Sequence, residues 1–246
     1  MAVTTTCDTY PLILVGTHHK TGTKWMLQLF EGFCAALGDR LYVGPQDRLP
    51  PATRVFFQHH SRFDLAVLGG PYRGLHVIRD PRDVLISGAR YHARASEPWL
   101  HRRHRRFWGL TYQEAIRWRR TLADAVLFEM DHAGAHTIRE MLAWDRTRPE
   151  FFEAKYEDLV ADRDLSLFRR LLPFLGYDAE QLPILEGIVR ERSLFGGRVS
   201  DPMHVSDGRP QQWREVFDER LRRRFRERFG DALERLGYEP GDGWRT

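Results

Sequence analysis

Residues 10–25 read YPLILVGTHHKTGTKW, and the order of residue types in this stretch decides the fold class. The apolar run at residues 10–15 ends at Gly16, which is the pattern of a buried parallel strand. A polar turn rich in Gly and Thr follows, and residues 25–30 then have a helical pattern. Strand, tight loop and helix in this order open an α/β unit.

The rest of the chain continues the alternation of strands and helices. Further strands are predicted at residues 54–58, 75–78 and 151–156. One helix is predicted to begin near Pro81, and the others lie at residues 112–130, 135–144, 165–175, 180–192 and 218–236. We therefore expect a single α/β domain over residues 1–246, with a central parallel sheet flanked by helices and a P-loop-like topology. Its core is expected at about residues 10–217, with a C-terminal helix at 218–237.

The loop after the first strand has the features of a phosphate site. Backbone N–H groups at the start of a helix are unpaired and carry the positive end of the helix dipole, so they bind phosphate. Gly22 allows a ligand to approach the backbone closely. Thr21 and Thr23 add hydroxyl donors, and Lys20 adds a positive charge. The loop is not a Walker A motif, because Gly16 and Gly22 are one residue too far apart and Lys20 precedes the second Gly.

A second phosphate signature follows the third predicted strand. Residues 79–87 read RDPRDVLIS, so Arg79 stands at the end of a strand and Ser87 stands one or two helical turns later. The guanidinium fork of Arg79 and the hydroxyl of Ser87 can converge on one phosphate. The alternative interpretation is a helix cap with a surface salt bridge.

Together the two motifs resemble those of sulfotransferases that use PAPS (3′-phosphoadenylyl sulfate). Residues 20–25, KTGTKW, resemble the 5′-phosphosulfate loop of that family, which is roughly Tyr-Pro-Lys-Ser-Gly-Thr-Thr-Trp. The chain departs from it at His18-His19, which replace Tyr-Pro, and at Lys24, which replaces the second Thr. Residues 79–87 resemble the family's 3′-phosphate motif, Arg-x-x-Arg/Lys-Asp-x-x-x-Ser. The resemblance spans about residues 10–217 and implies transfer of a sulfuryl group from PAPS to a hydroxyl or an amine.

The resemblance also implies which residues contact the donor. Tyr156 opens a Tyr-Glu-Asp-Leu stretch that lies near adenine in the family, and Trp25 would stack on adenine. Gly208 begins a partial match to the family's late loop, in which Arg209 would supply the missing charge. The implied donor-binding residues are Lys20, Thr21, Gly22, Thr23, Lys24, Trp25, Arg79, Ser87, Tyr156, Gly208 and Arg209.

A base and a charge stabiliser are needed for sulfuryl transfer. Lys20 is the candidate for stabilising charge on the departing phosphate. His59 and His60 follow the second predicted strand, at a carboxyl end where open α/β sheets bind ligands. Alignment with the family's Lys-Thr-His stretch makes His60 the general base, with His59 as the reserve candidate.

The acceptor cannot be identified from the sequence beyond a small molecule or a carbohydrate. Tyr91, His92 and Trp99 are candidate acceptor contacts, because the family places such segments after the 3′-phosphate helix. His59, the reserve base, is a fourth candidate contact. Residues 101–108, HRRHRRFW, form a basic segment that could bind nucleic acid, line an acceptor pocket or be a solvated face. We expect no nucleic-acid partner, and the oligomeric state cannot be deduced from the sequence.

Composition bounds the remaining possibilities. The net charge of +4 suits an anionic ligand, and Lys20 and Lys24 are two of only three lysines in the chain. With two cysteines, no basic leader and no apolar stretch of ~20 residues, a cytoplasmic protein without a membrane span is expected. No metal is expected, because adjacent His side chains in extended chain point opposite ways.

Two other functions fit parts of the pattern. An NTP-dependent kinase or ATPase would also use a loop between a strand and a helix, but it predicts the order Gly-Lys-Ser/Thr. A relative that binds the nucleotide without catalysis would keep both phosphate motifs.

Overall fold

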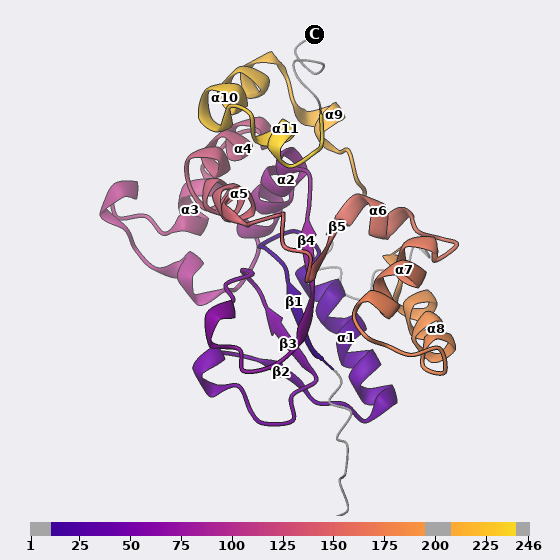
Figure 1. Ribbon diagram of the computed structural model, residues 1–246. Helices are drawn as coiled ribbons and strands as arrows, with labels where there is room; N and C mark the ends of the chain where they lie inside the picture. The colour runs from indigo at the N-terminus through magenta and orange to yellow at the C-terminus, as the bar shows by residue number, and fades with distance from the viewer. Residues whose placement is uncertain (1–10, 195–207, 240–246) are drawn as a thin grey trace, which may run out of the picture.

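Five parallel strands form the centre of the computed structural model, which describes residues 11–194 and 208–239 (Figure 1). The strand order is β2-β3-β1-β4-β5, so the first strand lies in the middle of the sheet. The strands are β1 (Leu12–Gly16), β2 (Leu41–Val43), β3 (Val55–Gln58), β4 (Tyr72–Ile78) and β5 (Phe151–Lys155).

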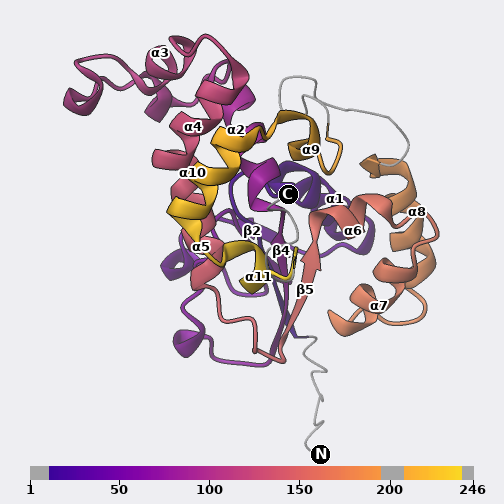
Figure 2. The same ribbon diagram turned by 90° about the horizontal axis from the view of Figure 1, so that it is seen from above.

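Helices cover the sheet, with α1 and α6–α8 on one side and α2, α4, α5 and α10 on the other (Figures 1 and 2). The α-helices are α1 (Thr23–Leu37), α2 (Pro81–His92), α3 (Tyr112–Arg117), α4 (Leu122–Asp131), α5 (Ala133–Ala143), α6 (Tyr156–Ala161), α7 (Ser166–Phe174), α8 (Leu182–Arg192), α9 (Trp213–Val216), α10 (Glu219–Phe229) and α11 (Ala232–Arg235). Short 3₁₀ turns are η1 (Gln46–Arg48), η2 (Leu65–Val67), η3 (Pro98–His101) and η4 (Arg105–Phe107). None of these helices is long and apolar enough to cross a bilayer.

Two apolar cores hold the layers together. Alternate residues of the central strands, such as Ile13 and Val15, pack with Phe30 and with α7 and α8. The second core lies among α2, α4, α5 and α10, where Val126 and Phe225 are fully buried. Burial of this apolar surface is the main stabilising term of the fold. The two cores hold α1 and α2 rigidly at the edge of the sheet where β1 and β4 end.

The predicted α/β class and the parallel sheet are confirmed. All four predicted strands are present, although residue 10 lies outside the described residues and Tyr156 begins α6 instead of ending β5. The prediction missed β2, which has only three residues and none of them buried. The helix expected at residues 112–130 is divided into α3 and α4, because the Thr121 side chain accepts a hydrogen bond from Asp124 N and starts a new helix there. The C-terminal helix is likewise divided, at Gly230.

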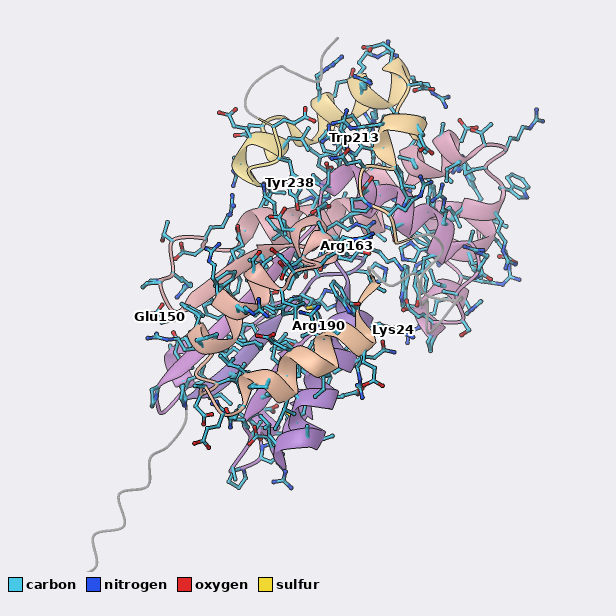
Figure 3. The ribbon with its side chains drawn as sticks, turned by 90° about the vertical axis from the view of Figure 1, so that its right-hand side faces the viewer. Lys24, Glu150, Arg163, Arg190, Trp213 and Tyr238 are labelled. Carbon is cyan, nitrogen blue, oxygen red and sulfur yellow. The ribbon has the colours of Figure 1, made fainter. Side chains whose placement is uncertain are left out.

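The C-terminal segment is joined to the first residues of α2 and α6. Trp213 lies under the guanidinium of Arg82, with its ring centre 3.4 Å from Cζ. The Tyr238 hydroxyl donates to Glu157 Oε2 at 2.9 Å. Figure 3 shows Trp213 and Tyr238 at the end of the molecule that the C-terminal helices form. These contacts hold the residues after 208 against α2 and α6.

Candidate functional site

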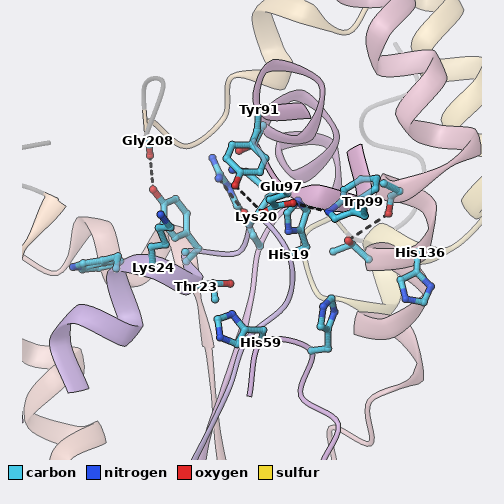
Figure 4. Close-up of a pocket in the computed structure, with 18 of the residues that line it drawn as sticks. His19, Lys20, Thr23, Lys24, His59, Tyr91, Glu97, Trp99, His136 and Gly208 are labelled. Atoms are coloured by element: carbon cyan, nitrogen blue, oxygen red, sulfur yellow. Dashed lines mark hydrogen bonds between the residues drawn. The ribbon is translucent and has the colours of Figure 1, made fainter. Parts of the chain in front are cut away.

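The carboxyl ends of β1, β3 and β4 meet at one edge of the sheet. Gly16 of β1 pairs with Gln58 of β3 and with His76 of β4, so the loops that follow these strands converge. A cavity of about 680 Å³ opens there (Figure 4). Its lining residues are His19, Lys20, Gly22, Thr23, Lys24, Trp25, His59, His60, Arg79, Ser87, Tyr91, Glu97, Pro98, Trp99, Ala133, His136, Thr137, Tyr156, Leu194, Gly208 and Gln212.

The loop after β1 is held in shape by its own hydroxyl groups. Thr21 Oγ1 and Thr23 Oγ1 both donate to the carbonyl oxygen of His18, at 2.9 and 2.8 Å. Thr21 is therefore fully buried and does not line the cavity, because its hydroxyl is used inside the loop. Gly22 precedes α1 with a φ of +95°, and Lys20 has a φ of +67°. The loop thus turns the first N–H groups of α1 and the Lys20 side chain toward the same space.

Gly22 is required by both its conformation and its surroundings. A Cβ at this position would lie 2.8 Å from the Tyr156 ring, and φ is in the left-handed region. We expect Gly22→Ala to destabilise the protein by about 1–3 kcal/mol, measured by thermal unfolding. We also expect it to weaken binding of PAP, the desulfated form of PAPS, measured by titration. Gly38→Ala has a similar φ of +72° but no atom within 4 Å of its Cβ, so it is the matched control. An equal loss of PAP affinity in both variants would contradict this account of Gly22.

Burial makes protonation of the Lys20 amine costly. Its Nζ lies 3.6 Å from the centre of the Tyr91 ring. Burial, and then the nearby Arg79 guanidinium, lower the pKa of Lys20 from its ordinary 10.5 to about 7. An anion beside Lys20 would reverse this shift, because a negative charge favours the ammonium form.

Arg79 is a buried cation that lacks a carboxylate partner among the described residues. Only 4% of its surface is exposed, and its Nη1 donates to the carbonyl oxygen of Lys20 at 3.2 Å. Its Cζ lies 4.3 Å from the centre of the Tyr156 ring. Its buried Nε–H has no hydrogen-bond partner in the part of the chain described. A buried donor without a partner on a cavity wall indicates an anionic ligand, and Ser87 lines the same cavity.

Two aromatic side chains, Trp25 and Tyr156, form another part of the cavity wall. Trp25 and Tyr156 meet edge to face with ring centres 6.1 Å apart, and Trp25 Nε1 donates to the carbonyl oxygen of Arg192 at 2.9 Å. The Tyr156 hydroxyl donates to the carbonyl oxygen of Gly208 at 2.8 Å, so the late loop reaches the cavity as expected. Arg209 does not line it, because its side chain turns outward to Glu215, with N and O 3.5 Å apart.

The late loop is also bound to α2. Asp83 accepts hydrogen bonds from Gln211 N at 2.6 Å and from Trp213 N at 3.0 Å. Burial raises the pKa of Asp83 to about 6. This anchoring had no signal in the sequence, since Asp83 and the loop are far apart in the chain.

His60 is backed by a carboxylate from α5. Its Nδ1 lies 2.9 Å from Glu140 Oε2, and Arg62 Nε donates to the other oxygen at 3.0 Å. Burial acts to raise the pKa of Glu140, but the interactions with His18, His60 and Arg62 outweigh it and hold that pKa well below its usual range. A carboxylate on Nδ1 leaves Nε2 of His60 as the nitrogen that can accept a proton. His59 also lines the cavity, and burial, followed by the charge of His60, lowers its pKa.

The cavity wall also contains a carboxylate, Glu97, that the sequence analysis did not single out. Glu97 accepts from the Tyr91 hydroxyl at 2.7 Å and from Trp99 Nε1 at 2.6 Å. Figure 4 shows these three side chains together, with His136 farther along the wall. Tyr91 and Trp99 lie where acceptor contacts were expected, whereas His92 is fully buried behind His19 because α3 and α4 pack over it. The basic segment at 101–108 is mostly exposed and leads into α3, which projects from the domain (Figure 2).

Comparisons with known proteins bear on the fold. No protein-family profile matches the chain, and no curated protein sequence matches it. Among solved structures, the mouse sulfotransferase SULT7A1 complexed with PAP is similar, with a TM-score of 0.56 and 16% identity over 91% of this chain and 83% of the other. Retinol dehydratase, in complex with androsterone and the inactive cofactor PAP, has a TM-score of 0.54 and 18% identity over 92% of this chain and 82% of the other. The chain therefore has the fold of these proteins, as the motifs implied.

Proposed function

We propose that this protein is a sulfotransferase that moves the sulfuryl group of PAPS to a hydroxyl or amine of a small-molecule or carbohydrate acceptor. The observation that carries the proposal is the convergence of Lys20 and Arg79 on one cavity at the sheet edge, with the buried Nε–H of Arg79 left without a hydrogen-bond partner among the described residues. The fold that the chain shares with two PAP-bound proteins supports the choice of donor.

The residues on the cavity wall fit a doubly phosphorylated adenosine. Gly22, Thr23 and Lys24 line the part beside the start of α1 and would hold the 5′-phosphosulfate. Arg79 and Ser87 would hold the 3′-phosphate, whose charge satisfies the orphaned Nε–H. Trp25 and Tyr156 would lie beside adenine. Thr21 and Arg209 do not reach the cavity, so their proposed role is to shape the two loops.

The chemistry needs a proton acceptor and a stabilised leaving group. His60 takes the proton of the acceptor hydroxyl while Glu140 keeps its Nδ1 protonated, and the acceptor oxygen forms a bond to sulfur. The bond between sulfur and the phosphate oxygen breaks, and its electron pair stays on PAP. The Lys20 ammonium stabilises that charge in a site where burial strengthens electrostatic interactions.

Incubation with ³⁵S-labelled PAPS and a panel of phenols, alcohols, amines and sugars tests the function. We expect transfer of label to at least one class, PAP as the co-product, and a mass gain of one SO₃ on the acceptor. Titration with ATP and Mg²⁺ separates the kinase alternative, which requires tighter binding of ATP than of PAP. Tight PAP binding without transfer to any acceptor would indicate a nucleotide-binding protein without catalysis.

Binding of PAP should take up a proton, because the pKa of Lys20 is about 7 in the free protein. At pH 8 the free side chain is mostly neutral, and bound phosphate raises its pKa, so PAP binding takes up about 0.9 proton. Affinity for PAP accordingly falls as pH rises above 7. Calorimetry at pH 8 in buffers of different ionisation enthalpy measures the uptake, which should vanish in Lys20→Met. An uptake that persists in this variant would assign the proton to another group.

A further inference from the structure

A second histidine that lines the cavity, His19, is the first member of a buried chain of hydrogen bonds. His19 Nε2 lies 2.8 Å from Nε2 of His92, the last residue of α2. His92 Nδ1 lies 2.6 Å from Oε1 of Glu129 in α4. His92 and Glu129 are both 0% exposed, whereas His19 lines the cavity. The chain therefore runs from a buried carboxylate to the wall of the site.

Glu129 accepts hydrogen bonds from two further groups. Besides His92, the Tyr112 hydroxyl donates to its Oε1 at 2.9 Å, and Gly134 N donates to its Oε2 at 3.0 Å. A carboxylate at this position accepts both of these bonds and has lone pairs left for an N–H of His92. Gly134 also lies in the first turn of α5, where the positive end of the helix dipole favours a negative charge.

The carboxylate determines the tautomer of both rings. His92 must donate Nδ1–H to Glu129, so its Nε2 carries a lone pair and accepts Nε2–H from His19. The two rings are nearly coplanar, at 3°, with centres 5.0 Å apart. Since the Nε2 atoms are much closer than the ring centres, the rings meet edge to edge, as an N–H···N hydrogen bond requires. The nitrogen of His19 left with a lone pair is Nδ1.

We propose that His19 is a second proton acceptor of the sulfuryl-transfer site and that His92 and Glu129 position it. The proposal rests on the proposed function. An acceptor hydroxyl that faces His19 passes its proton to Nδ1 as its oxygen bonds to sulfur, and the electron pair of the broken S–O bond stays on PAP. The imidazolium that forms is stabilised by Glu129 through His92, by the logic of a catalytic triad extended by one ring. Proton removal then does not depend on His60 alone.

The surroundings of His19 keep it neutral and available. Burial, followed by the charges of His92 and Lys20, lowers the pKa of His19 well below 6.5. Tyr91 packs on its ring at 5.7 Å, and His60 and Glu140 act on it from across the cavity, in opposite directions. The His19 ring of the free protein is therefore unprotonated throughout the neutral range, down to a pH below its ordinary pKa.

A similar pair in the same loop supplies the control. His18 Nε2 lies 2.9 Å from His76 Nε2, and His76 Nδ1 lies 3.2 Å from Glu153 Oε2. His18 is buried, and none of the three residues lines the cavity. His18 Nδ1 itself lies 3.9 Å from Glu140 Oε2. Glu153→Gln therefore removes the carboxylate of a similar chain that does not line the cavity, and in the His60→Ala background its link to His60 through Glu140 is absent.

Nuclear magnetic resonance tests the positioning without any turnover. Long-range ¹H–¹⁵N spectra of the PAP-bound protein at pH 7, assigned with His19→Asn, should show His19 with its proton on Nε2. In Glu129→Gln this preference should be lost, and in Glu153→Gln it should remain. A proton on Nδ1 of His19 in the wild type, or an unchanged tautomer in Glu129→Gln, would overturn the proposal.

Kinetics test the role as a base. We expect His60→Ala to retain transfer activity with a rate that stays level to well below pH 6.5. In that background His19→Asn or Glu129→Gln should lower kcat by a further 100-fold, on the order of one general base, while Glu153→Gln should not. If His60→Ala/His19→Asn is no slower than His60→Ala, His19 is not a base. If the wild type transfers no sulfuryl group, the proposed function fails and the catalytic role with it, and the spectra then report only a structural chain.

Discussion

Lys20→Met should lower the rate of sulfuryl transfer by about 100- to 1000-fold, the usual cost of losing one charge-stabilising group. A thioether cannot stabilise a departing phosphate, and we assign that role to Lys20, whose Nζ lies 3.6 Å from the centre of the Tyr91 ring, whereas Lys24 also lines the cavity. Single-turnover mixing with labelled PAPS measures the effect on the chemical step. Lys155→Met is the matched control, since Lys155 lies on β5 with its Nζ over the Tyr238 ring and does not line the cavity. An equal rate in wild type and Lys20→Met would remove Lys20 from the mechanism.

The same substitution should stabilise the free protein. Burial lowers the pKa of Lys20 from 10.5 to about 7, so the folded state resists the charged form. Between these two values the unfolded chain binds the extra proton, and stability therefore rises with pH through this window. Below pH 7 the full cost of the buried charge is present. The gain in melting temperature of Lys20→Met should thus be largest near pH 6.5 and small near pH 10. A gain independent of pH would indicate a packing effect instead.

Arg79→Ala should weaken PAP binding by about 100-fold, because charge-assisted hydrogen bonds contribute about 1.5–3 kcal/mol each. The guanidinium is already buried against Tyr156 with an unused Nε–H, so no reorganisation is needed when a phosphate arrives. The decisive measurement compares PAP with adenosine 5′-phosphate by calorimetry. Wild type should prefer PAP strongly, and Arg79→Ala should bind both about equally.

A conservative control sharpens this result. Arg79→Lys keeps the charge but loses the fork and the Nε donor, so it should recover only part of the preference for PAP. If Arg79→Ala weakens the two nucleotides equally, Arg79 supports the Lys20 loop through its hydrogen bond to the Lys20 carbonyl oxygen and does not contact the 3′-phosphate.

Features that are local in the chain could be predicted. The apolar run of β1, the Gly-rich turn and the start of α1 are consecutive residues, and each has its own conformational preference. The same holds for Arg79 at the end of β4 and for Pro81 at the start of α2. Parallel strands bring their carboxyl ends to one edge, so the convergence of Lys20, His60 and Arg79 followed from topology alone.

Features that depend on how helices pack could not be predicted. Glu140 reaches His60 from 80 residues away, and Glu129 reaches His92 from 37 residues away. Neither pairing has a spacing signal, because the contacts depend on how α2, α4 and α5 pack against one another. His92 was expected to face the acceptor, but that packing turns it inward onto Glu129.

The amino-acid sequence alone was enough to specify the α/β class, the loop between β1 and α1, and the convergence of Lys20, His60 and Arg79 on one cavity, since these depend on short-range conformational preference and strand order. Only the tertiary structure decided which histidines line the cavity and which residues hold their ring nitrogens. The physical reason is that a ring's free nitrogen depends on the hydrogen bond made by its other nitrogen. Here each of those partners comes from a helix distant in the chain.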